Sequence, residues 1–171
     1  MNFFHYSEKE LILENMVYDQ FRQEWQAKPV GLWISVEDAW KEWCENENYC
    51  IEKLKFKHQV ILKQGANILY LNTAKEIADL SKRYPYLRDQ WNDGIGRKIC
   101  SSYEIDWLKV KSEYQGIIIS PYQWDCRLLQ VSCWYYGWDC ASGCIWDLSC
   151  IESFTLVEQE ERKDDLVQAQ G

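Results

Sequence analysis

Residues 113–146 constrain the fold more than any other part of this chain. Their sequence, EYQGIIISPYQWDCRLLQVSCWYYGWDCASGCIW, joins an apolar run to a dense aromatic block that carries very little charge. The rings of this aromatic block are Tyr122, Trp124, Trp134, Tyr135, Tyr136 and Trp138. Each ring buries a large area, and Tyr and Trp keep one polar group. The block therefore forms either a tryptophan-rich core or a walled site with a few placed polar groups, for which the candidates are Asp125, Arg127, Asp139 and Ser142.

The length of the chain fits a single domain. A chain of 171 residues can bury about 70% of the surface that its unfolded form exposes. The sequence is 47% hydrophobic and 27% charged, as is typical of a globular protein, and a run of charged residues begins at Glu158. We predict one α+β domain over residues 1–157 and a charged, disordered tail over residues 158–171.

The overall charge argues against a polyanionic partner. The chain has 19 Lys and Arg against 27 Asp and Glu, a net charge of -8, which repels phosphate backbones and disfavours long nucleic acids. No segment approaches the ~20 apolar residues of a membrane span, and acidic residues interrupt the start of the chain where a signal peptide needs an apolar run. We expect no membrane partner, and a protein that is cytoplasmic or is secreted as an effector without a cleavable signal peptide. The sequence does not indicate an oligomeric state.

The eight cysteines contain no C-x-x-C pair. Zinc sites normally use such tight spacing, so we expect buried free thiols and no metal. A metal site and disulfides formed after secretion remain the alternatives. A cysteine nucleophile paired with His5 or His58 is a further alternative, although His58 is interpreted as a structural or exposed residue.

Hydrophobic patterns predict more strands than helices. The predicted strands are 2–7, 32–35, 54–62, 68–71, 116–119, 143–148 and 150–157. The predicted helices are 36–46, 74–83 and 103–113; Ser35 is a suitable N-cap for the first of them, and Thr73 with Glu76 for the second. Runs of consecutive strands indicate an α+β fold with antiparallel sheets, and no glycine fingerprint of a Rossmann fold or P-loop is present.

Four segments, taken in this order, resemble the ADP-ribosyltransferase superfamily. They are HYS at 5–7, KPVGLWIS at 28–35, YLNTAKEIADL at 70–80 and EYQGIIISPY at 113–122, and the resemblance covers about residues 2–150. It implies two small antiparallel sheets that form a cleft, with flanking helices. It also implies that NAD is the substrate, that no metal is needed, and that ADP-ribose is transferred to a side chain of an acceptor protein, as by a bacterial toxin or effector.

The resemblance also implies roles for particular residues. A histidine on the first strand contacts the ribose or nicotinamide of NAD, which here is His5, and Ser7 lies on the same strand face and assists it. Trp33 supplies a stacking surface for the nicotinamide. Ser35 is either a hydroxyl donor to NAD or only the helix cap. Tyr122, at the end of EYQGIIISPY, is a further candidate for contact with NAD.

The late acid departs from the common pattern of the superfamily. That acid stabilises the positive charge that develops as the bond to nicotinamide breaks, but no clear glutamate follows the strand at residues 117–119. Asp139 best suits the position before the next strand, and Asp125 is the second choice. A pocket without this acid binds NAD but does not transfer ADP-ribose. The alternative function is a non-catalytic module whose aromatic block binds a partner protein or a nucleotide.

Overall fold

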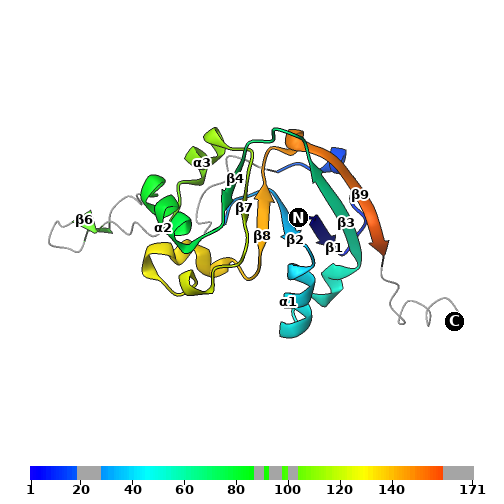
Figure 1. The fold of residues 1–171 in the computed structure, drawn as a ribbon, viewed down its shortest axis with the longest axis horizontal. Helices are drawn as coiled ribbons and strands as arrows, with labels where there is room; N and C mark the ends of the chain where they lie inside the picture. Colours follow the sequence, from blue (N-terminus) through cyan, green and yellow to red (C-terminus); the bar gives the residue numbers. More distant parts are fainter. Residues whose placement is uncertain (19–27, 87–90, 93–97, 100–103, 160–171) are drawn as a thin grey trace, which may run out of the picture.

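The computed structural model describes residues 1–18, 28–86, 91–92, 98–99 and 104–159. Seven strands form one mixed sheet, visible in the order β4-β7-β8-β2-β1-β3-β9 across Figure 1. These strands are β1 (Phe3–Ser7), β2 (Leu32–Val36), β3 (Phe56–Leu62), β4 (Ile68–Leu71), β7 (Gly116–Ile119), β8 (Ser142–Ile145) and β9 (Ile151–Gln159). A separate ribbon pairs β5 (Trp91–Asn92) with β6 (Lys98–Ile99). The helices are α1 (Ala39–Glu47), α2 (Ala74–Arg83) and α3 (Trp107–Glu113), which with the mixed sheet give an α+β architecture.

The expectation of two small antiparallel sheets is wrong. Strand β1 pairs with β2 along one edge and with β3 along the other, so it joins what would otherwise be two sheets. The two junctions are unequal, because β1 and β3 share five residue pairs whereas β1 and β2 share two, Phe3 with Val36 and Phe4 with Ser35. The sheet is also not wholly antiparallel, since β4 and β7 run parallel.

Local signals explain why α2 and β7 form where they do. The Thr73 side chain accepts a hydrogen bond from the backbone N–H of Glu76, and the Glu76 carboxylate accepts from the backbone N–H of Thr73, which completes the predicted capping box. All four residues of β7 are buried. Ile117 and Ile119 pack toward α2 and α3 on one face of the sheet, and Ile118 packs on the opposite face. A strand with two buried faces needs the continuous apolar run that the sequence has there.

The ends of several elements differ from the predicted ends. Helix α1 begins at Ala39 and not at Val36, because Val36 ends β2 and Glu37 turns the chain with a φ of 50°. Strand β8 ends at Ile145, ahead of a 3₁₀ turn at Leu148–Cys150. Strand β9 continues to Gln159, so the first two residues of the predicted tail belong to the sheet, and residues 160–171 lie outside the described residues.

Half of the rings of the aromatic block belong to the core. Trp134, Tyr135 and Trp138 are buried in the cluster that α2 and α3 cover, whereas Trp124 and Tyr136 are exposed. The block follows β7 as two 3₁₀ segments, Trp124–Cys126 and Gln130–Gly137. The core interpretation therefore holds for the buried rings of the block, and the exposed rings remain available for a binding site.

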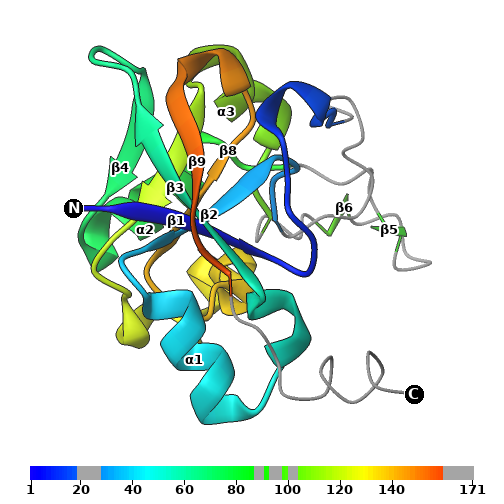
Figure 2. The same cartoon turned by 90° about the vertical axis from the view of Figure 1, so that its right-hand side faces the viewer.

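Helix α1 lies apart from α2 and α3, beside the 3₁₀ turn Ile51–Leu54 (Figure 2). It covers a small core under β1, which contains Tyr6, Cys44 and Leu54. No helix within the described ranges is long and apolar enough to cross a membrane. The seven cysteines whose placement is described are all free thiols.

Candidate functional site

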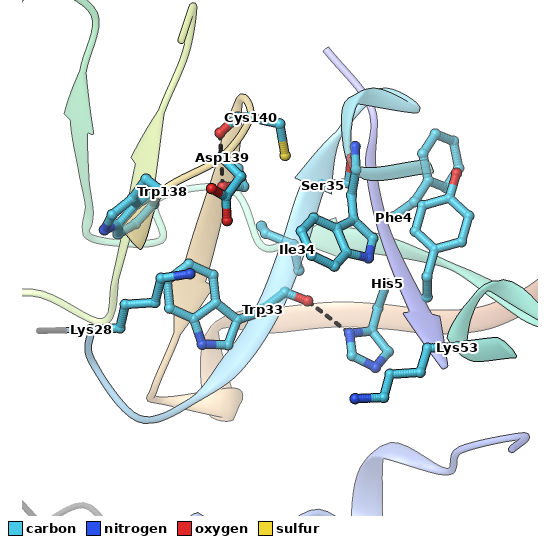
Figure 3. Close-up of a pocket in the computed structure, with 13 residues that line it drawn as sticks. Phe4, His5, Lys28, Trp33, Ile34, Ser35, Lys53, Trp138, Asp139 and Cys140 are labelled. Carbon is cyan, nitrogen blue, oxygen red and sulfur yellow. Dashed lines mark hydrogen bonds between the residues drawn. The ribbon is translucent and has the colours of Figure 1, made fainter. Parts of the chain in front are cut away.

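A pocket of about 410 Å³ opens where β1 and β2 separate. The ladder of hydrogen bonds between the two strands ends at the pair of Phe4 with Ser35. Residues of both strands near this point line the pocket. The lining residues come from β1, β2, α1, the 3₁₀ turn at Ile51–Leu54, the segment 138–140 that leads into β8, the first residue of β8, and Lys28 ahead of β2. They are Phe4, His5, Tyr6, Lys28, Trp33, Ile34, Ser35, Trp40, Lys53, Trp138, Asp139, Cys140 and Ser142 (Figure 3).

His5 bridges the gap between the two strands. Its Nδ1 lies 2.7 Å from the backbone carbonyl oxygen of Trp33 (Figure 3). A carbonyl oxygen only accepts, so Nδ1 carries the proton and Nε2 is left with a free lone pair. Burial lowers the pKa of His5, with a smaller lowering from His58, while the hydrogen bond to Trp33 acts in the opposite direction. The ring is therefore neutral at physiological pH, and Nε2 can accept a hydrogen bond from a ligand hydroxyl.

Trp33 forms an aromatic wall together with Trp138. The two ring centroids are 4.8 Å apart with an edge-to-face angle of 62°, a favourable arrangement for aromatic pairs. The ammonium of Lys28 lies 5.0 Å from the centroid of the Trp33 ring. This end of the pocket thus combines an aromatic ring with a positive charge that lies over one of its faces.

Asp139 lies at the same end of the pocket and is held by Arg127. The guanidinium of Arg127 donates to an Asp139 carboxylate oxygen at 3.2 Å. Arg127 in turn lies over the exposed rings of Trp124 and Tyr136, at 5.8 and 5.4 Å from their centroids. The ion pair fixes the direction of the carboxylate but also neutralises part of its charge.

Ser35 acts as a helix cap. Its hydroxyl donates to the carbonyl of Glu37 at 2.8 Å and accepts from the backbone N–H of Trp40 at 2.9 Å. Asp38, at the N-terminus of α1, makes no side-chain cap of its own, so Ser35 satisfies an otherwise free N–H of the first turn. The residue lines the pocket, but its only donor hydrogen is already used.

The structure brings together His5, Trp33, Ser35 and Asp139 and leaves two predicted residues out. Ser7 does not line the pocket, and its hydroxyl donates to the carbonyl of Lys9 at 2.7 Å. The Tyr122 hydroxyl donates to the carbonyl of Trp138 at 2.5 Å and supports the aromatic wall from behind. Asp125, the second choice for the acid, is also absent from the lining.

Several lining residues were not predicted from the sequence as site residues. Lys28 stands at the start of the KPVGLWIS segment, where its charge next to a predicted strand was the available signal. Trp40 lies within the predicted helix 36–46, and that prediction did not mark it as a pocket residue. Tyr6 donates its hydroxyl to Asp38 at 2.5 Å, so its ring serves as wall. No periodic pattern marks Lys53, which reaches the pocket from the turn after α1.

The two histidines differ in their surroundings. His58 is 1% exposed, stacks on Phe154 with centroids 4.6 Å apart, and accepts a 3.3 Å hydrogen bond from the N–H of Leu11. His58 is therefore a structural residue, and the alternative expectation that it is exposed is wrong.

The thiols of the pocket are poor nucleophiles. Burial raises the pKa of Cys140 to about 12, despite a hydrogen bond with Ser142 that acts to lower it. Burial also raises the pKa of the neighbouring Cys144. Both remain protonated at neutral pH, whereas a nucleophilic cysteine needs a lowered pKa. Within the described part of the chain, no group of three or more His, Cys, Asp or Glu side chains is arranged to hold a metal ion.

Comparisons with protein-family models, with curated proteins and with solved structures each found no match to this chain. The function must therefore be argued from the geometry and charge of the pocket.

Proposed function

We propose that this protein is an NAD-dependent mono-ADP-ribosyltransferase that modifies a side chain of an acceptor protein. The observation that carries the proposal is that His5, Trp33 and Asp139 border one pocket although they are more than a hundred residues apart at the extremes. A neutral hydrogen-bond acceptor, a stacking ring and a carboxylate are the three groups that the reaction needs.

The charge of the pocket fits an anionic ligand with aromatic rings. Lys28 and Lys53 line the pocket with one acid, Asp139, whose carboxylate is already paired with Arg127. The pocket is therefore locally positive in a chain whose net charge is -8. Its volume of about 410 Å³ is toward the lower end of the ~300–1,000 Å³ that is usual for ligand sites. This is space for one base and its ribose, with the rest of the dinucleotide outside.

In the proposed reaction the bond between the ribose C1′ and the nicotinamide nitrogen breaks, and the nicotinamide leaves with the electron pair. The ribose then carries an oxocarbenium-like positive charge. Asp139 stabilises this charge, Nε2 of His5 accepts from a ribose hydroxyl, and Trp33 stacks on the departing ring. A nucleophilic side chain of the acceptor protein forms the new bond to C1′ and loses its proton.

Binding and turnover of NAD test the proposal. Titration with NAD should quench the fluorescence of the pocket tryptophans, and free nicotinamide should then accumulate. Binding without release of nicotinamide would instead support a non-catalytic nucleotide-binding module. Absence of both binding and release would refute the proposal.

The two candidate acids give a matched pair of variants. Asp139→Ala should lower NAD turnover by at least ~100-fold, the order expected when a group that stabilises developing charge is removed. Asp125→Ala should turn NAD over like the wild type, because Asp125 is exposed and does not line the pocket. Circular dichroism must remain native in both variants. Full activity in Asp139→Ala would remove Asp139 from the mechanism.

The class of acceptor can be tested with labelled NAD and a mixture of cell protein, DNA and RNA. Label should appear mainly on protein, since few phosphates of a long nucleic acid can be neutralised by an acidic chain. Label mainly on nucleic acid would refute the protein acceptor.

The alternative binding module has lost part of its support. Of the six rings of the aromatic block, Trp134, Tyr135 and Trp138 are buried and Tyr122 is partly buried. The remaining Trp124 and Tyr136 flank Arg127 and offer a smaller surface.

A further inference from the structure

Lys28 is a partly buried cation for which the described part of the chain supplies no hydrogen-bond acceptor. Among the described residues, no carboxylate forms an ion pair with its ammonium and no acceptor takes a hydrogen bond from it; its close partner is the face of the Trp33 ring, 5.0 Å away. Asp139 acts on it electrostatically without direct contact. Burial lowers the pKa of Lys28, although Asp139, Cys140 and Cys144 act to raise it, so the described residues compensate its charged form only in part.

The position of Lys28 is prepared by its neighbours. A Cβ atom on Gly137 would lie 2.9 Å from Cε of Lys28, so the absence of a side chain at Gly137 gives the lysine stem its space. Trp33 supports the ammonium from the other side. Figure 3 places Lys28 at the Trp138 end of the pocket and Lys53 at the His5 end.

Lys28 also lies between two pockets. A second pocket of about 500 Å³ is lined by Lys28, Trp33 and Gly137 together with Tyr18 and residues 29–31. Lys28 and Trp33 are the residues that this second pocket shares with the pocket of about 410 Å³ described above. A ligand that occupies both pockets must therefore pass the ammonium of Lys28.

We infer that Lys28 binds the anionic linker of the ligand, and so selects ligands in which a phosphate or diphosphate group follows the ring held by Trp33. A charge-assisted hydrogen bond from Lys28 to a phosphate oxygen supplies the acceptor that the described residues do not provide. The inference rests on the proposed function only for the choice of NAD as the full ligand, since its anion-binding part is tested with inorganic pyrophosphate.

Lys28→Met is the direct variant, because methionine keeps an unbranched stem over Trp33 and Gly137 and removes the charge. Lys75→Met is the matched control, because Lys75 is an exposed lysine of α2 that lines neither pocket. Affinities for NAD, inorganic pyrophosphate and free nicotinamide are measured by calorimetry and tryptophan fluorescence. We expect Lys28→Met to weaken NAD and pyrophosphate binding by ~10- to 100-fold, the range for loss of a charge-assisted hydrogen bond. Nicotinamide, which is uncharged, should bind within ~3-fold of wild type, and Lys75→Met should change each of these affinities by less than ~5-fold.

Gly137→Ala gives a second test that leaves every charge in place. The added methyl group should push the flexible end of Lys28 away from its position, so anion affinity should fall while the fold is retained. Lys28→Arg should recover most of the affinity lost in Lys28→Met. These two variants distinguish loss of a positioned cation from a general loss of structure.

The outcomes separate this inference from the proposed function. If wild-type protein binds pyrophosphate but neither binds nor cleaves NAD, the transferase proposal fails and the role of Lys28 is judged by the pyrophosphate data. If NAD is turned over and Lys28→Met binds both ligands like the wild type, the role of Lys28 is refuted and the transferase stands. Failure of the wild type to bind millimolar pyrophosphate would also refute it.

Discussion

His5 has two ring nitrogens with different tasks, and two substitutions can separate them. The amide nitrogen of asparagine occupies roughly the position of Nδ1 of histidine, so His5→Asn retains the donor to the Trp33 carbonyl and removes the acceptor at Nε2. The glutamine amide reaches the position of Nε2, so His5→Gln retains a polar atom toward the pocket and loses the 2.7 Å bond to Trp33. The two variants should therefore lose different properties.

The expected losses follow from the contacts of each nitrogen. His5→Gln leaves the partly buried Trp33 carbonyl without its partner, which costs about 1–3 kcal/mol of unfolding free energy. For a chain of this size the loss corresponds to a fall in Tm of roughly 2–12 °C. His5→Asn should lose only about 1 kcal/mol, mainly from the ring contacts with His58 and Phe154.

Turnover should show the opposite order. Removal of Nε2 in His5→Asn should lower nicotinamide release by ~100-fold, equivalent to about 2.7 kcal/mol of transition-state stabilisation. His5→Gln, assayed below its Tm, should stay within ~10-fold of wild type. Thermal denaturation and nicotinamide release on the same preparations check both statements. An asparagine variant with full turnover, or a glutamine variant with an unchanged Tm, would refute the division of tasks.

Three further outcomes are expected. Ser35→Ala should lower the unfolding free energy by about 2 kcal/mol through loss of a buried cap, and Thr73→Ala, which removes an exposed cap far from the pocket, should lower it by about 1 kcal/mol. Both variants should retain NAD turnover when they are assayed in the folded state. Selective loss of turnover in Ser35→Ala would instead make the Ser35 hydroxyl a ligand contact. Arg127→Met should lower kcat ~10-fold with little change in KM, because the carboxylate that it holds loses its direction, and an unchanged kcat would show that the ion pair is only structural. Burial lowers the pKa of both His5 and His58, so below about pH 6.5 the unfolded chain binds more protons than the folded chain. The contribution of these histidines to stability should be complete above that pH and should fall as the pH decreases toward their folded-state pKa values. Denaturant titrations at pH 7.5 and 5.5 that give equal stability would contradict this.

The elements that could be predicted from the sequence are those whose signals are local. The run at 116–119 had to be buried on both faces because it contains no polar residue, and β7 is. The Thr73–Glu76 spacing predicted the start of α2 to the residue. Such signals act within one turn or one strand, where few competing contacts can override them.

The pairing of strands could not be predicted in this way. Nothing in the HYS segment indicates that β1 pairs with β3 over five residues but with β2 over two. Such pairing depends on contacts between segments far apart in the sequence, and here it joins seven strands in one sheet. The early separation of β1 and β2 also opens the pocket. The predicted site residues came from a resemblance of segments, whereas the presence of Lys28, Trp40 and Lys53 in the pocket lining required the fold.

The net charge of the chain and the charge of the pocket act over different distances, which reconciles an acidic protein with an anionic ligand. At physiological ionic strength a surface charge is felt over about 8 Å, so a long nucleic acid meets the average of many side chains, which here is negative. A small ligand inside the pocket meets only the groups that line it, where Lys28 and Lys53 outnumber Asp139 and low exposure to solvent weakens screening. Asp139 is further balanced by Arg127 at 3.2 Å. Under the proposed function, the same chain repels polyanions at its surface and holds a diphosphate in the pocket, so the selection depends on the size of the ligand.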